Sequence, residues 1–128
     1  MSRPPRPAPS AEPAQEAVLT KAVLRAAELL ELSGSALART LGVSEASVSR
    51  LYSGGRAVDP KGKEGELALL LVRVYRSLDA LVGSDPDQRK AWLQSHNRGL
   101  NGTPAELIQS AAGLVAVVAY LDAMRAPA

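Results

Sequence analysis

The sequence predicts an all-α fold, in which a helix-turn-helix bundle is followed by a small helical module at the C-terminal end. Apolar residues make up 46% of the 128 residues, but aromatic residues make up only 3% and phenylalanine is absent. The core must therefore be built from Leu, Val and Ala, which favours packed helices over a sheet. Apolar residues recur at three- and four-residue spacing in several segments, as on one face of an α-helix, and no strand-length alternating run is present.

The composition excludes several kinds of site and location. The chain has no cysteine, which excludes disulfides and thiolate metal sites. Its net charge of +2 does not by itself indicate nucleic-acid binding. The N-terminal arginines are not followed by the apolar stretch of a signal peptide. The longest apolar run, Ala111 to Leu121, is shorter than the ~20 residues that span a bilayer. We therefore expect a soluble, cytoplasmic protein with no membrane partner.

The pattern along the chain predicts four segments. Residues 1–15 are rich in Pro, Ala and Ser and predict a disordered tail; a basic arm that follows DNA is the alternative. Residues 16–58 predict the helix-turn-helix domain, residues 59–65 a linker rich in glycine and charge, and residues 66–128 the second helical domain.

Three helix boundaries follow from capping and turn residues. The first helix is expected to begin at Glu16 and to end at Gly34, with Ser35 as the cap of the next helix. Further along, Asp85 predicts another cap, with Pro86 at the first helical position.

The segment 66–82 predicts a helix that is apolar around most of its circumference. A narrow polar stripe remains at Glu66, Arg73 and Arg76. A helix this apolar is usually buried on most sides. We expect it to be either the hub of the domain or part of a dimer interface.

The segment from Ser35 to Gly54 has the layout of a helix-turn-helix. Its inward-facing residues are expected to be Leu37, Ala38, Leu41, Val48 and Leu51. Gly42 supplies the turn, Val43 fills the corner and Ser44 caps the second helix. In this motif the second helix enters the major groove of DNA.

The DNA-contacting residues expected under this interpretation are Arg39, Ser44, Glu45, Ala46, Ser47, Ser49 and Arg50. Arg50 is the one long cationic donor on the second helix and suits guanine or phosphate. Arg39 and Arg56 flank the unit and could bind the DNA backbone. The alternative is a helical hairpin that only packs. If DNA is bound, we expect a homodimer to supply the affinity.

The stretch "HNRGLNGTPAELI", His96 to Ile108, concentrates residues that are typical of catalytic loops. However, His96 has no cysteine to activate and no nearby carboxylate to orient it, and a single histidine does not make a metal site. We therefore predict no catalytic residues, no metal and no cofactor. Instead, Thr103 and Glu106 predict a capping box with Pro104 at the first helical position.

The residues before this capping box predict a turn. Gly99, Asn101 and Gly102 suit backbone with positive φ. The helix that follows is expected to present an apolar face formed by Leu107, Ile108, Leu114, Val117, Val118 and Leu121.

The stretch "AWLQSHNRGLNGTPAELIQSAAGLVAVVAYLDAM" resembles the toxin-binding domain of Xre/MbcA/ParS antitoxins. The positions that match the family pattern are Trp92, Leu93, Asn97, Leu100, Gly102, Pro104, Leu107, Ile108, Gly113, Val117 and Leu121. The upstream segment resembles an Xre/Cro-like helix-turn-helix, which usually accompanies this domain. Asn101 replaces the first glycine of the family's pair, the turn before Pro104 is one residue shorter, and "MRAPA" replaces the usual glycine-bearing C-terminal end.

The resemblance implies the antitoxin of a type II toxin–antitoxin pair. Its partner would be a RES-domain toxin that consumes NAD or transfers ADP-ribose, neutralised by occlusion of its active site. The protein would also bind operator DNA and regulate its own operon, without catalysis of its own. The toxin-contacting residues that the resemblance implies are His96, Asn97, Arg98, Leu100, Asn101, Gly102, Arg125, Ala126, Pro127 and Ala128. The alternative is a stand-alone dimeric repressor whose C-terminal helices serve only as a dimer clamp.

Overall fold

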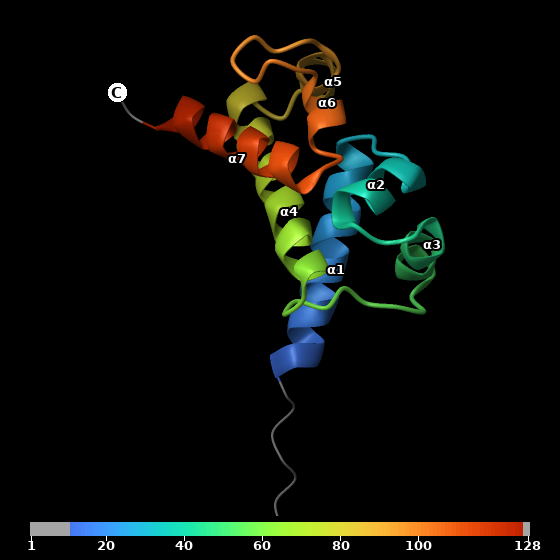
Figure 1. The fold of residues 1–128 in the computed structure, drawn as a ribbon. Coiled ribbons are helices and arrows are strands. Elements are labelled where there is room, and N and C mark those ends of the chain that lie inside the picture. Colours follow the sequence, from blue (N-terminus) through green and yellow to red (C-terminus); the bar gives the residue numbers. More distant parts are fainter. Residues whose placement is uncertain (1–10, 127–128) are drawn as a thin grey trace, which may run out of the picture.

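The computed structural model describes residues 11–126, and over this range the chain folds into helices joined by turns and loops, with no strand. This confirms the all-α prediction. The helices are α1 (Ala11–Leu29), α2 (Gly34–Leu41), α3 (Glu45–Ser53), α4 (Lys63–Val82), α5 (Pro86–Gln94), α6 (Pro104–Leu107) and α7 (Ala111–Arg125), drawn in Figure 1. Within the described residues, no helix is both long and apolar enough to cross a membrane.

Helix α4 lies at the centre of the fold. It packs against α1 and α7 along much of its length and also contacts α2 and α5 (Figure 1). Leu71, Val74 and Leu78 of α4 are fully buried, and they belong to one core that also contains residues of α1, α2, α3, α5 and α7. This is the hub arrangement expected of a helix that is apolar around most of its circumference.

Helices α2 and α3 form the predicted helix-turn-helix. Gly42 adopts φ 69°, which a side chain would make unfavourable, and so it turns the chain after α2. The Ser44 hydroxyl accepts a hydrogen bond from the Ser47 amide at 3.0 Å, which confirms the predicted cap of α3. The predicted inward-facing residues of both helices are buried.

The start of α1 and the start of α2 differ from the predictions. Helix α1 begins at Ala11, so the predicted disorder of residues 11–15 is wrong; residues 1–10 of that predicted tail lie outside the described residues. Ser33, not Ser35, caps α2, since its hydroxyl accepts from the Ala36 amide at 3.0 Å. Gly34 is the first residue of α2 instead of ending α1. Glu31 takes the positive φ, at 57°, in the turn between them.

The predicted linker 59–65 is partly helical, because α4 begins inside it at Lys63. The Glu64 carboxylate accepts a hydrogen bond from the Asp59 amide at 3.0 Å and pairs with Arg56 at 2.7 Å. Gly65 is buried, and a Cβ there would collide with the backbone of Asp59 and Pro60. The division into residues 16–58 and 66–128 therefore stays a prediction.

One nearly buried arginine joins three helices. Arg89 of α5 donates to the Asp79 carboxylate of α4 at 3.0 Å and to the Leu29 carbonyl of α1 at 3.2 Å. Its guanidinium also lies over the Tyr75 ring, 5.5 Å from the ring centre. The hydrogen bond from Arg89, together with one from Ser84, lowers the pKa of Asp79.

The predicted capping box at Thr103 is wrong. Thr103 precedes α6 but makes no side-chain capping bond, and α6 ends after one turn at Leu107. The long C-terminal helix α7 begins only at Ala111, where the Ser110 hydroxyl accepts from the Gly113 amide at 3.1 Å. The predicted apolar face still forms, because Ile108 packs from the segment between the two helices while the face of α7 is buried.

The turn between α5 and α6 also differs from the prediction. Of the three residues expected to adopt positive φ, only Asn101 does so, at 53°. Gly99 and Gly102 lie instead where neighbouring side chains leave little or no room for a Cβ. A Cβ on Gly99 would lie 2.6 Å from the Tyr120 ring, and one on Gly102 would lie 3.1 Å from the Leu107 side chain.

Candidate functional site

The first candidate surface is the exposed face of α3. Side chains of Glu45, Ala46, Ser49 and Arg50 are exposed there, with Ser44 at the end of the helix and Ser47 half-buried beside it. Arg50 donates to the Ser47 hydroxyl at 3.3 Å, which keeps this cation on the same face as the serines. The structure therefore brings the predicted contacts of α3 together on one surface.

The two arginines expected to flank this surface have different surroundings. Arg39 is exposed on α2, where it donates to Gln109 and to Ser35, each at 2.7 Å. Arg56, by contrast, is half-buried and forms an ion pair with Glu64 at 2.7 Å. The ion pair occupies part of the Arg56 guanidinium and disfavours the expected contact with the DNA backbone, which stays a prediction.

Tyr52 lies at the C-terminal end of α3. Partial burial and the negative charge of Glu28 raise the pKa of its phenol. The phenol therefore remains a hydrogen-bond donor at neutral pH, at the edge of the same surface.

The second candidate surface is the loop 95–103 between α5 and α6. Asn97 and Gly102 pair through two backbone hydrogen bonds, of 2.8 Å and 3.2 Å. The Asn97 side-chain oxygen accepts from the Leu100 amide at 3.0 Å, which closes the loop on itself. His96, Arg98 and Asn101 are exposed, whereas Leu100 packs against the core. Six of the predicted toxin contacts thus belong to one compact loop, with Gly102 among them half-buried at its base.

The loop rests on α7 through aromatic residues. Gly99 lies against the Tyr120 ring, and this ring in turn lies 6.4 Å from that of Trp92 in α5. Arg125, in the last turn of α7, instead donates to the Ser77 hydroxyl of α4 at 3.2 Å. The structure thus connects the loop with α7 but does not bring Arg125 against the loop.

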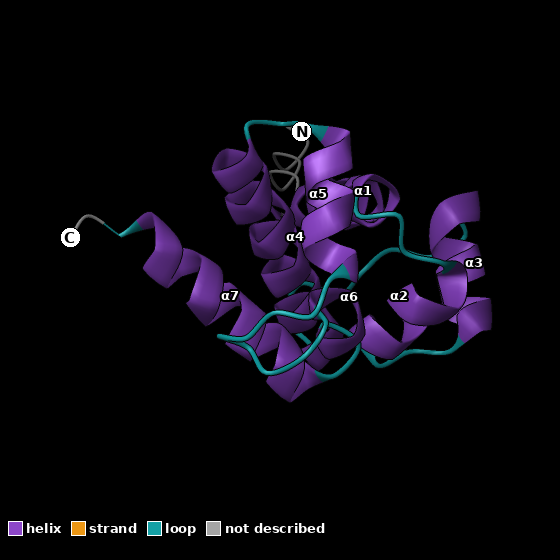
Figure 2. Ribbon diagram, turned by 90° about the horizontal axis from the view of Figure 1, so that it is seen from above, coloured by secondary structure: helices purple, strands orange, loops and turns teal. Residues whose placement is uncertain are grey.

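The C-terminal end of α7 lies on the opposite side of the molecule from α3, as Figures 1 and 2 both show. Ala126 is exposed at this end. Pro127 and Ala128, two further predicted contacts, lie outside the described residues.

The outward face of α7 is a surface that the sequence interpretation missed. Its exposed side chains between Ser110 and Asp122 are apolar and small: Ala111, Ala112, Val115, Ala116 and Ala119. Val115 is 53% exposed. A helix that is apolar on every side is usually buried, yet α7 is covered by the rest of the chain on only one side. The uninterrupted apolar run of the sequence was the signal that could have indicated this face.

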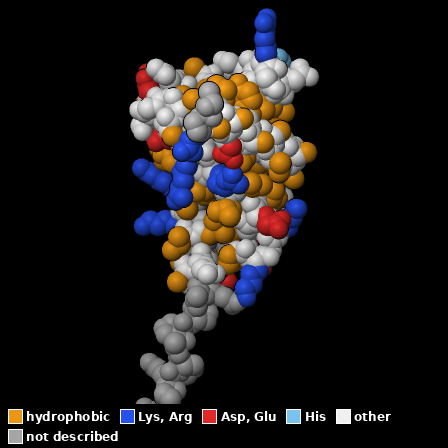
Figure 3. Space-filling view, turned by 90° about the vertical axis from the view of Figure 1, so that its left-hand side faces the viewer, with side chains coloured by type: hydrophobic (Ala, Val, Ile, Leu, Met, Phe, Trp, Pro, Cys, Tyr) orange, Lys and Arg blue, Asp and Glu red, His pale blue; other side chains and the backbone are white. Residues whose placement is uncertain are grey.

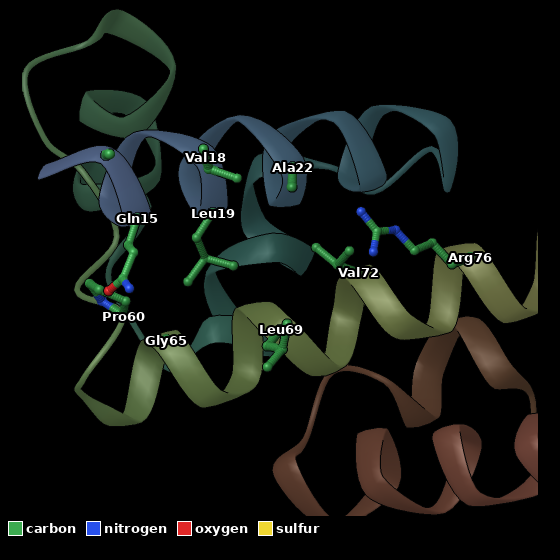
Figure 4. Close-up of a pocket in the computed structure, with 10 residues that line it drawn as sticks. Gln15, Val18, Leu19, Ala22, Pro60, Gly65, Leu69, Val72 and Arg76 are labelled. Carbon is green, nitrogen blue, oxygen red and sulfur yellow. The ribbon is translucent and has the colours of Figure 1, made fainter. Parts of the chain in front are cut away.

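A shallow groove of about 550 Å³ lies between α1 and α4 (Figure 4). Leu19, Ala22 and Val72 line it, while Val18 and Leu69 project beside it and are 68% and 55% exposed. In the space-filling view of Figure 3, hydrophobic side chains cover much of one face of the molecule and are interspersed with charged side chains. This groove was also missed, because it needs residues from two helices that are far apart in the sequence.

Comparison with known families matches both halves of the chain. The antitoxin Xre-like helix-turn-helix domain matches residues 9–73, and the antitoxin Xre/MbcA/ParS C-terminal toxin-binding domain matches residues 77–126. The chain belongs to the Xre/MbcA/ParS antitoxin family. Among curated proteins, no match to the chain was found.

The two candidate surfaces of this antitoxin lie in different matched domains. The face of α3 belongs to the helix-turn-helix domain, whereas the loop 95–103 and α7 belong to the toxin-binding domain. The two matched ranges meet between residues 73 and 77, inside α4. The antitoxin therefore shares its central helix between its two domains.

Proposed function

We propose that this antitoxin neutralises a RES-domain toxin, one that consumes NAD or transfers ADP-ribose, by covering the toxin's active site. The observation that carries the proposal is the uncharged outward face of α7, which is exposed within the toxin-binding domain and lies next to the loop 95–103. Covering this face removes apolar surface from water, which favours association. Occlusion excludes substrate by contact alone and needs no catalytic residue on the antitoxin.

Within this proposal the loop supplies polar recognition at the edge of the apolar contact. His96 and Arg98 are exposed donors, and the backbone pairing of Asn97 with Gly102 holds them in a defined shape. A loop held in one shape loses little conformational freedom on binding. Arg125 and Ala126 extend the contact at the end of α7.

The helix-turn-helix supports a second part of the proposal, autoregulation of the operon through DNA. Arg50 and the serines of α3 supply donors for bases and phosphates. Operator DNA and NAD both occur in the cytoplasm, where we place the protein.

We also propose that the antitoxin is a homodimer that pairs through the groove between α1 and α4. The exposed Val18 side chain and the groove beside it are both apolar. Two copies related by a twofold axis could therefore each place Val18 against the groove of the other.

Two exposed valines provide a crossed test of these surfaces. Val115→Glu places a charge on the face of α7 and should weaken the toxin complex roughly 30-fold or more, while leaving the dimer intact. Val18→Glu should do the reverse, giving monomers that still bind toxin. The partner used in the test is the product of the neighbouring gene, which the proposal expects to be a RES-type toxin. Light scattering after size exclusion measures the dimer, and calorimetry measures the toxin complex.

The outcomes separate the proposals. If the wild-type protein forms no complex with the neighbouring RES-type toxin at micromolar concentration, neutralisation is excluded and the stand-alone repressor remains. If Val115→Glu binds toxin as well as the wild type, α7 is not the contact. If Val18→Glu stays dimeric, the groove is not the dimer interface.

A further inference from the structure

A side-chain bridge connects the helix-turn-helix with the toxin-binding domain. Arg39 of α2 donates from Nε to the Gln109 side-chain oxygen at 2.7 Å. This hydrogen bond joins α2 to the segment between α6 and α7. Figures 1 and 2 both draw α6 beside α2, so the two residues meet where the domains face each other.

The Gln109 side chain is held in one orientation. Its Nε2 donates to the Ala105 carbonyl at 3.0 Å, and its Oε1 accepts from Arg39. Rotating the amide by half a turn would place oxygen against oxygen and nitrogen against nitrogen, so only this orientation satisfies both contacts. Gln109 is half-buried, which further restricts the side chain.

The Arg39 guanidinium is held at two points. Besides Nε, its Nη1 donates to the Ser35 hydroxyl at 2.7 Å. Two bonds to a planar group determine the plane in which its other donors lie. The residue is exposed, so those other donors are accessible to a phosphate. An arginine whose orientation is already determined loses less conformational freedom when it binds.

We propose that Gln109 of the toxin-binding domain is a positioning residue that holds Arg39 ready to bind a DNA phosphate. The inference rests on the proposed DNA binding. It gives the C-terminal domain a part in DNA affinity, although none of its residues contacts the DNA. The recognised chemistry is the phosphodiester group, so the effect is independent of base sequence.

The test measures binding of the full chain to a fluorescent duplex of random sequence over a range of salt concentrations. Arg39→Ala should weaken binding and lower the slope of log affinity against log salt by about 1. Gln109→Met keeps the side-chain volume but removes the acceptor. It should weaken binding about threefold with an unchanged slope, because the cation is still present.

The double variant distinguishes positioning from a general loss of structure. If Gln109 acts through Arg39, Arg39→Ala with Gln109→Met should bind no more weakly than Arg39→Ala alone. Additive losses, or wild-type affinity for Gln109→Met, would overturn the proposal while leaving DNA binding intact. If the wild-type protein shows no salt-dependent binding to the duplex, the proposed DNA binding itself fails. Thermal unfolding of each variant confirms that all of them are folded.

Discussion

Whether a glycine of this antitoxin could carry a side chain depends on how closely other parts of the chain approach it. Gly113 lies in the first turn of α7, and a Cβ there would collide with the backbone carbonyl of Leu107. The segment between α6 and α7 can therefore pass over the start of α7 only because the side chain is absent. Gly34, at the start of α2, has no such neighbour, since a Cβ there would lie 4.0 Å from Val48.

We expect Gly113→Ala to lower the free energy of unfolding by about 3 kcal/mol, because the backbone must move to relieve the collision. Gly34→Ala is the matched control and should be neutral or stabilise by up to about 1 kcal/mol, as alanine favours the helix. Urea unfolding followed by circular dichroism measures both. Equal effects of the two substitutions would contradict this view of Gly113.

The Asp79–Arg89 pair predicts a dependence of stability on pH. The pKa of Asp79 is lowered in the folded protein from its ordinary value of 3.8, mainly by the hydrogen bond from Arg89. The ionised carboxylate therefore stabilises the fold fully above the ordinary value, and this contribution is lost as the pH falls through the lower, folded-state pKa. Asp79→Asn should be less stable than wild type at pH 6.

The difference in the free energy of unfolding between the wild type and Asp79→Asn should shrink as the pH falls, because the wild-type carboxyl is then neutral as well. Urea unfolding at a series of pH values from 6 downward measures the difference. A gap that stays constant down to the lowest pH would show that the charge of Asp79 contributes nothing to it.

At the scale of the helices, the capping residues decide where α7 begins. Thr103, Pro104 and Glu106 have the sequence of a capping box, yet the hydroxyl of Thr103 makes no capping bond and Ser110 caps the long helix instead. The local pattern gives both sites an acceptable cap. Ile108 packs into the core between these two sites, so that α6 ends before α7 begins.

We predict that Ser110→Ala costs about 1 kcal/mol of stability, the usual value for the loss of an N-cap. Thr103→Val keeps the shape of the side chain and removes only its hydroxyl, so it should cost less than about 0.5 kcal/mol. Chemical unfolding of the two variants under one set of conditions gives the comparison. A larger loss of stability for Thr103→Val than for Ser110→Ala would support the capping box at Thr103 instead.

At the scale of the whole molecule, one core runs through both domains. Residues of α1, α2 and α3 share buried contacts with those of α4, α5 and α7, and α4 belongs to both matched families. We therefore expect a single cooperative thermal transition for the antitoxin alone, with equal calorimetric and van't Hoff enthalpies. Two resolved transitions in a calorimetric scan would show that the domains unfold separately.

Much of this architecture could be predicted from local pattern. Spacing of Leu37, Leu41 and Val48 was sufficient to predict the inner faces of the helix-turn-helix. The apolar circumference of α4 predicted either a hub or a dimer interface, and the packing within the chain shows the hub. Contacts between distant segments could not be predicted. Nothing in the sequence pairs Arg56 with Glu64, or Arg39 with Gln109, because each pairing depends on how the elements pack.

The same limit applies to the candidate surfaces. The residues of the loop 95–103 predicted a turn, whereas its role as a toxin contact was implied by the family resemblance and stays a prediction; His96 and Arg98 are exposed there. The groove between α1 and α4 requires Val18 and Leu69 to line the same hollow. A single sequence gives no sign of this arrangement, since each residue alone resembles an ordinary member of an apolar face.

The shared helix α4 constrains how such antitoxins can exchange partners by recombination. A crossover in the loop around Asp59 would separate Glu64 from Arg56 and leave α1 against a foreign helix. A crossover near the boundary of the two matched ranges, between residues 73 and 77, would keep the first part of α4, including the Glu64 partner of Arg56, with its own helix-turn-helix. The segment exchanged for a new toxin specificity would then consist of the C-terminal part of α4 and the chain that follows it, joined to the helix-turn-helix domain within α4.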